Sequence, residues 1–186
     1  MLQEDCSYLE KSEDNRQKEV VSIPVSLSRS MQGKYFVGQT DTLVVGDGSN
    51  AWAGLVNPHN SNVYLYANVF TISNFSDDYI TAEIWLNTNI SEEGVISHNV
   101  SPTNTAIRPL PKNKVNIRFV QSTTAVPEHG VNVYERIVPP NTTLVGEEDG
   151  KFIEPSGGNY VIVLKSSSLK LDKVIVAFGW WENSTC

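Results

Sequence analysis

The sequence predicts an all-β protein: a two-sheet antiparallel sandwich, with a jelly roll as the favoured topology, preceded by an extended N-terminal arm. Short runs of apolar and β-branched residues recur along the chain, and the segments between them are rich in Gly, Pro, Asn, Asp and Ser. No stretch keeps the 3.6-residue apolar spacing of an amphipathic helix. Roughly eight to ten strands at this spacing are typical of a sandwich. An immunoglobulin-like sandwich is less favoured, because the Cys-Trp-Cys core spacing is absent.

The N-terminal segment is predicted to be a flexible arm over residues 1–19, followed by the sandwich domain over residues 20–186. The arm holds six acidic and three basic side chains and few large apolar ones. Such a segment buries too little apolar surface to offset the entropy that ordering costs. We therefore expect it to act as a connector that becomes ordered when something else binds it.

An edge strand is expected directly after the arm, in the run VVSIPVSLS over residues 20–28. Apolar and polar residues alternate in this run with the period of a half-buried strand. A proline inside such a run suits a strand at the edge of a sheet. The apolar face of this edge or donated strand consists of Val21, Ile23, Val25 and Leu27.

Further strand signals follow in order, each ended by a short polar connection. They cover residues 34–38, 41–46, 63–73, 79–88, 114–121, 131–138, 159–166 and 173–181. The runs 63–73 and 79–88 are the longest pair and are separated only by NFSDD. This short polar connection predicts an antiparallel hairpin.

Charge and hydropathy exclude several classes of partner. The net charge of −7 argues against nucleic acid, since phosphate contacts need clustered Lys and Arg. No apolar run approaches the roughly 18 residues of a membrane span, so none is expected. The N-terminus, MLQEDCSYLEK, is acidic and polar and has no recognisable signal peptide. A location outside the cell would therefore require another export route.

No motif in the chain indicates an enzyme or a cofactor. A nucleophile elbow and a phosphate-binding glycine loop are both absent. The three histidines, His59, His98 and His129, lie far apart in loop-like contexts, whereas metal sites are usually announced by a short ligand spacing. We therefore predict a protein without catalytic residues, bound cofactor or metal.

The acidic residues next to glycines have two interpretations. Asp41, Asp47 and Asp149 lie in oxygen-rich loops of a kind that can hold Ca²⁺. They are also ordinary β-turn residues, which is the favoured interpretation. The neighbouring carboxylates Glu147 and Glu148 form a run that we expect to be solvated in a polar loop.

The aromatic residues are candidates for an interface. Trp180 and Trp181 are adjacent on a predicted strand and so point to opposite faces of the sheet. One can fill the core, and the other is left for an interface, for local packing or for stacking on a ligand. With Trp52 and Trp85 they also allow an alternative function, a carbohydrate-binding module that stacks exposed aromatic rings on sugars.

The two cysteines, Cys6 and Cys186, lie at the extreme ends of the chain. Bonds from Cys6 of one chain to Cys186 of another would join subunits head to tail, and a heterologous contact that does not close produces a fibre. An edge strand at 20–28 could augment a neighbour's sheet in the same assembly. An intramolecular bridge and two free thiols remain the alternatives.

Three stretches resemble an uncharacterised family from spore-forming Firmicutes. They are GKYFVGQTDTLVVGDGSNAWAGLVNP, NVYLYANVFTISNFSDDYITAEIWLN and VIVAFGWWE, and the resemblance runs from about Gly33 to Glu182 without an assigned chemistry. A cysteine-bearing arm before a jelly roll is also similar in architecture to endospore appendage pilins, whose N-terminal connectors form disulfides with neighbouring subunits. This chain is longer than those pilins and has one cysteine in its arm.

These observations together predict a structural subunit that is not an enzyme. It would assemble with copies of itself, and with other surface proteins as further candidate partners, into a pilus-like fibre or layer on a spore surface or cell exterior. The alternative is the carbohydrate-binding sandwich, whose partner would be a glycan.

Overall fold

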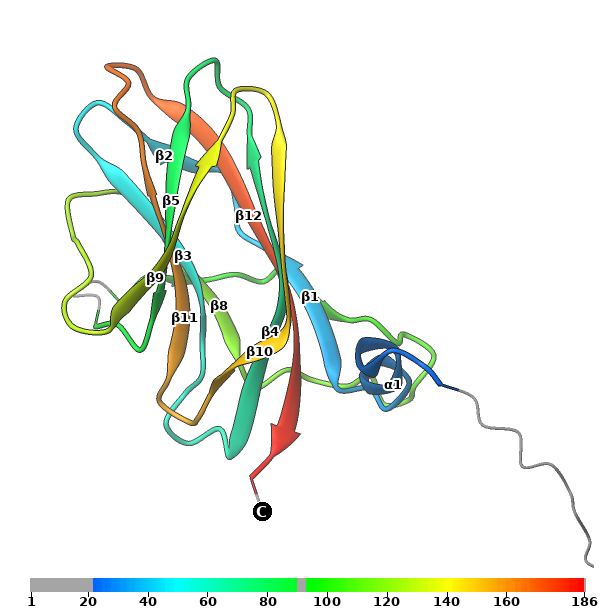
Figure 1. The fold of residues 1–186 in the computed structure, drawn as a ribbon. Coiled ribbons are helices and arrows are strands. Elements are labelled where there is room, and N and C mark those ends of the chain that lie inside the picture. The colour runs from blue at the N-terminus through cyan, green and yellow to red at the C-terminus, as the bar shows by residue number, and fades with distance from the viewer. Residues whose placement is uncertain (1–21, 90–92, 186) are drawn as a thin grey trace, which may run out of the picture.

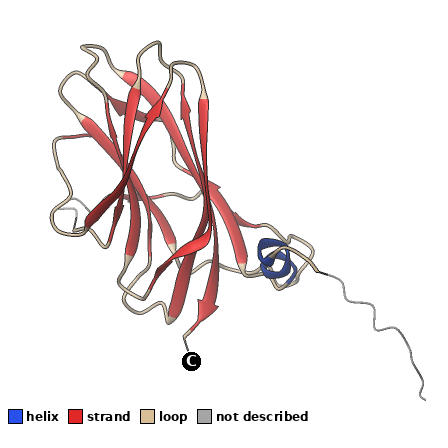
Figure 2. Cartoon of the chain, viewed as in Figure 1, coloured by secondary structure: helices blue, strands red, loops and turns tan. Residues whose placement is uncertain are grey.

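The computed structural model describes residues 22–89 and 93–185, and it confirms the predicted fold class. Two antiparallel sheets of six strands each pack face to face as a sandwich, with one short helix at the side (Figures 1 and 2). The elements in chain order are α1 (Val25–Met31), β1 (Tyr35–Gln39), β2 (Leu43–Val45), β3 (Asn50–Val56), β4 (Val63–Asn74), β5 (Ile80–Leu86), β6 (Val95–Ile96), β7 (Val100–Pro102), β8 (Asn116–Thr123), β9 (Val131–Val138), β10 (Thr143–Glu154), β11 (Asn159–Lys165) and β12 (Asp172–Ser184).

The strand order is that of a jelly roll. The first sheet, called the β12 sheet below, runs β10-β4-β12-β1-β7, with β2 also paired to β12; the second, the β11 sheet, runs β6-β8-β3-β11-β5-β9. The antiparallel pairs β1·β12, β3·β11, β4·β10 and β5·β9 join early strands to late ones. These four pairs form one long antiparallel hairpin that is folded over the two sheets, as in a jelly roll. Strands β6, β7 and β8 are inserted in the sequence between β5 and β9.

The core lies between the two sheets and consists of apolar side chains that point inward at every second residue of the strands. On β4, alternate residues from Val63 to Ala67 point inward, and the inward set resumes at Phe70. The shift occurs because β4 has one extra residue, Asn68, opposite the junction of Gly179 and Trp180 on β12. The bulge thus keeps apolar side chains facing the core on both sides of it.

The N-terminal run predicted as an edge strand is a helix instead. Val25 and Leu27 lie in α1, Ile23 lies just before it, and Val21 is outside the described residues. Pro24 suits this position, since a proline is tolerated where a helix begins, and its carbonyl accepts the first helical bond from the Ser28 N–H at 3.1 Å. The edge next to β1 is occupied by β7, so the segment has no ladder to join there.

The predicted hairpin of 63–73 with 79–88 is also wrong. Both strands form, but β4 lies in the β12 sheet and β5 in the β11 sheet. The connection crosses between the sheets, and Asn74 holds it: the Asn74 side-chain amide donates to the carbonyls of Asp78 at 2.8 Å and of Pro139 at 3.1 Å. Consecutive strands of a jelly roll often change sheets in this way, which a short polar linker does not reveal.

Candidate functional site

The two adjacent tryptophans are both buried inside the subunit, which corrects the prediction that one anchors an interface. Trp180 is fully buried in the core and donates from Nε1 to Glu182 Oε1 at 3.1 Å. Trp181 points to the outer face of the β12 sheet but is only 4 % exposed. Its ring stacks on Tyr66 and Tyr35, with centroids 5.3 and 6.3 Å away, and β10 covers it. Local packing, one of the three alternatives, is therefore the role of Trp181.

Glu182 is a buried carboxylate that ties the end of β12 to the segment before β8. Besides the Trp180 bond, it accepts the backbone N–H of Lys114 at 3.0 Å to each oxygen and that of Val115 at 3.0 Å. Burial raises the pKa of Glu182, and these hydrogen bonds oppose the shift. The run WWE thus has a structural role.

The other two tryptophans share the outer face of the β11 sheet. Trp52 packs with Val161 and Val163 in a small apolar cluster separate from the main core, and Trp85 lies against the same cluster. Trp52 is 3 % exposed, which corrects the prediction that it is an exposed interface aromatic. Trp85 is half-buried, and its Nε1 donates to Glu83 Oε2 at 3.1 Å.

A cavity of about 560 Å³ lies beside Trp52. Described residues of the connections β3–β4, β5–β6 and β10–β11 line it together with the start of β11. Its apolar lining includes Val56 and Val161, and its polar lining includes Asn57, Thr88 and Arg118. An aromatic side chain among a few convergent polar groups is the usual composition of a small-molecule site.

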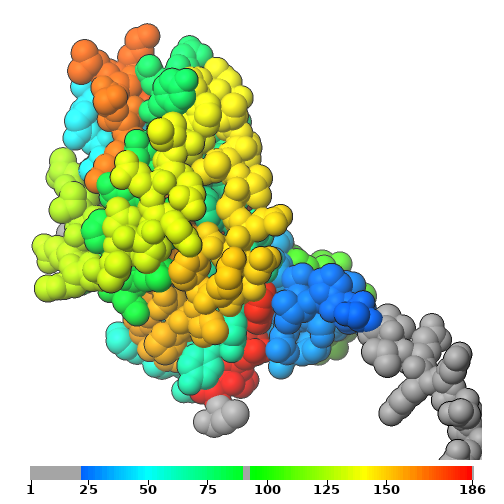
Figure 3. All heavy atoms as spheres, viewed as in Figure 1, coloured from blue at the N-terminus to red at the C-terminus, as the bar shows by residue number. Residues whose placement is uncertain are grey.

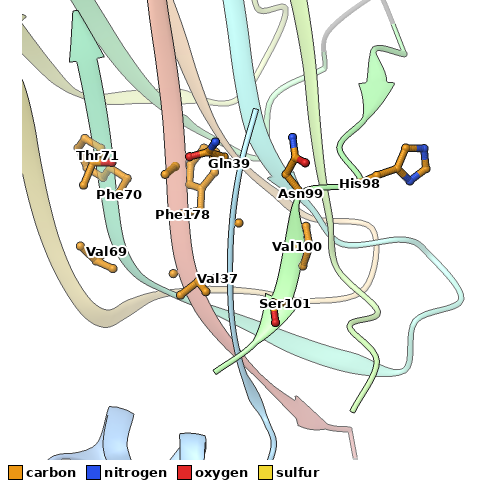
Figure 4. A pocket seen from close by; sticks show the side chains of 13 residues that line it. Val37, Gln39, Val69, Phe70, Thr71, His98, Asn99, Val100, Ser101 and Phe178 are labelled. Carbon is orange, nitrogen blue, oxygen red and sulfur yellow. The ribbon is translucent and has the colours of Figure 1, made fainter. Parts of the chain in front are cut away.

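A second hollow, of about 640 Å³, lies on the outer face of the β12 sheet (Figure 4). It crosses β4, β12, β1 and β7, and we call it the trough. Its lining includes Val37, Val69 and Gly179. Only glycine fits at position 179 without movement of its neighbours, since a Cβ there would lie 2.6 Å from Tyr35 Oη and 2.8 Å from Val69 Cγ1. The trough is therefore open and partly apolar.

Helix α1 presents unusual apolar exposure for so short an element. None of its residues is buried, and it stands out beside the C-terminal end of β12 (Figure 3). Four apolar side chains in and before it are 44–63 % exposed; they are Ile23, Val25, Leu27 and Met31, and we call them the α1 patch. Leu27 and Met31 are four residues apart, a spacing typical of a helix. The alternation of apolar and polar residues in 20–28 favoured a strand instead.

Two buried carboxylates lie outside these surfaces. Burial alone raises the pKa of Glu154 to about 7. Glu148 is 7 % exposed, which corrects the expectation that its acidic run is solvated in a loop, since it lies on β10 with its side chain inward. Burial raises the pKa of Glu148, and Lys151 and Arg136 oppose the shift. Its neighbour Glu147 is exposed.

The remaining predicted residues lie in loops, except Asp149, which lies in the irregular middle part of β10. His59, His98 and His129 are exposed outside the strands, as expected. Asp47 and Asp149 have φ values of 50° and 51°, the left-handed conformation of turn residues. Asp41 accepts a hydrogen bond from Asn99 Nδ2 at 3.1 Å.

Within the described residues, 22–89 and 93–185, no set of three or more His, Cys, Asp and Glu is arranged to hold a metal ion. Within the same ranges, no helix has the length and apolar character needed to cross a membrane. Cys6 and Cys186 lie outside the described residues, so their predicted bonds stay a prediction.

The fold and these surfaces define a jelly-roll domain with an apolar helix at its side. Residues 6–186 match the model of DUF6143, a family of unknown function, so the chain belongs to this family. Comparison with curated proteins and with solved structures gave no match.

Proposed function

We propose that the protein is a structural subunit, without enzymatic activity, that assembles with copies of itself into a fibre or layer. The supporting observation is the α1 patch, whose four apolar side chains keep 44–63 % of their surface exposed in the described chain. Large apolar side chains exposed close together in a folded protein often mark an interaction site.

The apolar side chains of helix α1 are not accounted for by packing inside the subunit, because no residue of the helix is buried. A helix of 7 residues is far below the length of about 12–15 at which isolated helices become stable in water. It is held to the body by polar contacts such as Thr103 Oγ1 to Ser30 Oγ, at 2.8 Å. A hollow of about 260 Å³ lies between the helix and the β12 sheet, lined by Leu27 and Tyr35 among others. A second copy that covers the α1 patch would remove this apolar surface from water.

The trough on the β12 sheet is the proposed acceptor for the α1 patch of the next copy. The two surfaces differ, so the contact is heterologous, and a heterologous contact that does not close gives an open chain of subunits. Val37, at 41 % exposure, is the trough side chain on which the contact would centre.

Inter-subunit disulfides are the proposed second link of this assembly. The Glu182 N–H donates to the Lys34 carbonyl at 3.0 Å, so the chain enters the sandwich after α1 at the end where β12 leaves it. Cys6 and Cys186 lie outside the described residues, and bonds between them in neighbouring copies are proposed to reinforce the contact between subunits. A spore or cell surface is the proposed location, on the ground of the resemblance to a family of spore-forming Firmicutes that the sequence alone suggests.

Light scattering coupled to size-exclusion chromatography tests the apolar contact under reducing conditions. The unmodified chain should form oligomers whose mass rises with concentration, whereas Leu27→Ser/Met31→Ser should stay monomeric. Leu169→Ser/Leu171→Ser is the matched control, because these two leucines are also exposed but lie in the β11–β12 connection. Equal masses for all three proteins would contradict the proposal.

The acceptor is tested separately with one charged substitution. Val37→Glu should weaken association, and Ile137→Glu, an exposed position on the other sheet, should not. If Val37→Glu associates as tightly as the unmodified chain, the trough is not the acceptor.

Carbohydrate binding is a second proposed function, compatible with the first. The observation that favours it is the cavity beside Trp52, which combines an indole ring with convergent polar side chains.

A further inference from the structure

We propose that the cavity beside Trp52 binds a neutral, hydroxyl-rich ligand of about one or two sugar rings, contacted by Trp52, Asn57, Thr88 and Arg118. This inference rests on the second proposed function and is independent of the first. The volume of about 560 Å³ falls within the range of small-ligand sites.

Four of the residues that line this cavity each have a buried polar atom without a hydrogen-bond partner in the described chain. Trp52 Nε1, Asn57 Oδ1, Thr88 Oγ1 and Arg118 Nε are all buried and find no partner among the described residues, and all four residues line the cavity. Proteins pair the great majority of their buried polar groups, because an unpaired one is costly. Because all four atoms belong to residues of one cavity lining, a ligand bound there is the proposed source of their partners, reached by small side-chain movements.

The chemistry of these atoms fits hydroxyl groups. Trp52 Nε1 and Arg118 Nε donate hydrogen bonds, Asn57 Oδ1 accepts them, and the Thr88 hydroxyl does both. A sugar hydroxyl also donates and accepts, so it can satisfy every member of the set. Trp52 and Val161 add apolar atoms to the lining of the cavity, although little of either side chain is accessible.

The charges around the cavity favour a neutral ligand over an anion. Arg118 is the guanidinium that lines it, and its Nη1 lies 3.3 Å from Glu93 Oε1 and donates to the Glu93 carbonyl at 2.8 Å. Glu93 therefore already balances the positive charge. A phosphate or carboxylate would have to compete with this carboxylate, whereas a neutral hydroxyl leaves the ion pair intact.

The polar side chains are held in place by other contacts. Asn159 fixes Thr88 twice, since its Oδ1 accepts the Thr88 N–H at 3.1 Å and its Nδ2 donates to the Thr88 carbonyl at 2.8 Å. Asn57 Nδ2 donates to the Val63 carbonyl at 2.8 Å, which sets the position of Oδ1. Groups fixed before binding lose little entropy when a ligand arrives.

Trp85 provides a control on the same sheet face. Its indole N–H is already paired with Glu83 and it does not line the cavity. Thr88→Val removes one unpaired polar atom with little change of shape, and it should not lower the urea midpoint of unfolding, because the atom removed has no partner to lose among the described residues. Trp52→Phe also removes part of a buried ring that packs with Val161 and Val163, so its urea midpoint should fall.

The test uses monomeric protein from size-exclusion chromatography, so its result does not depend on assembly. The probes are the methyl pyranosides of glucose, galactose, mannose and N-acetylglucosamine and their β-1,4-linked disaccharides, followed by saturation-transfer NMR and by the ¹H–¹⁵N indole signals. At least one probe should bind and shift the Trp52 indole N–H signal. Trp52→Phe and Thr88→Val should weaken that binding fivefold or more, and Trp85→Phe by less than twofold.

Three results would overturn the inference. The first is that no probe gives protein-dependent saturation transfer, which would leave the cavity to ordered water. The second is that the bound probe shifts the indole signals of other tryptophans and not that of Trp52, a measurement that needs no variant. The third is that Trp52→Phe and Thr88→Val bind the probe as tightly as the unmodified chain.

Discussion

Removal of the Glu182 carboxylate should destabilise the fold by about 3 kcal/mol, because three donors lose their acceptor together. Glu182→Ala leaves the N–H groups of Lys114 and Val115 and the indole N–H of Trp180 unpaired. An unpaired buried donor costs about 1–3 kcal/mol. We take the lower end for each, since the Lys114 side chain is exposed and the removed carboxylate itself was costly to bury.

Urea unfolding at pH 7, followed by tryptophan fluorescence, measures this effect. Glu182→Gln keeps one acceptor oxygen at the same place and should lose about 1–2 kcal/mol. Glu147→Ala is the control, because that carboxylate is exposed, and it should change the free energy of unfolding by less than about 0.5 kcal/mol. A loss below about 1 kcal/mol for Glu182→Ala would refute the reasoning that Glu182 links β12 to the segment before β8.

Two further predictions concern stability. Burial raises the pKa of Glu154 from 4.5 to about 7, so the folded state keeps a proton that the unfolded chain releases. Glu154 should therefore contribute a fall in stability of about 2–3 kcal/mol between pH 5 and pH 8 in urea unfolding. Glu154→Gln should remove this contribution and leave that of Glu148 and Glu182, whose pKa values burial also raises; an unchanged slope in the variant would contradict the reasoning. Gly150→Ala should cost about 3 kcal/mol, because its φ is +71° and a Cβ would overlap the ring of Trp181. Gly48→Ala, with φ +76° and open space around it, should cost only about 1 kcal/mol in thermal unfolding, and equal losses would show that Trp181 is not packed against β10.

The fold class was predictable because strand signals depend on local patterns. The two-residue alternation in 114–121 and the β-branched runs in 159–166 and 173–181 are properties of single strands, and each became one. Sheet assignment depends on contacts between distant segments, which local patterns do not encode. The hairpin prediction for 63–73 and 79–88 was wrong for that reason. The short polar linker does make a tight connection, but it joins the two sheets and not two paired strands.

The candidate sites were harder to predict than the fold. The residue type of a tryptophan does not reveal its exposure. Trp181 faces outward yet is covered, because the irregular part of β10 between Glu147 and Phe152 brings Gly150 against its ring. The cavity beside Trp52 is formed by three connections that the jelly roll brings together from distant parts of the chain. The apolar spacing around Pro24 fits a strand, with a period of two residues, and also contains pairs four residues apart, as in a helix. The sequence alone therefore did not decide between the two.

Negative-stain microscopy of the purified full chain, with and without reductant, tests self-assembly most directly. Under oxidising conditions we predict extended polymers of one repeating subunit, which shorten or dissociate when the disulfides are reduced and are absent in the Leu27→Ser/Met31→Ser variant. Isolated particles of single-subunit size at high protein concentration, unchanged by reductant, would contradict the assignment of this protein as a self-assembling subunit.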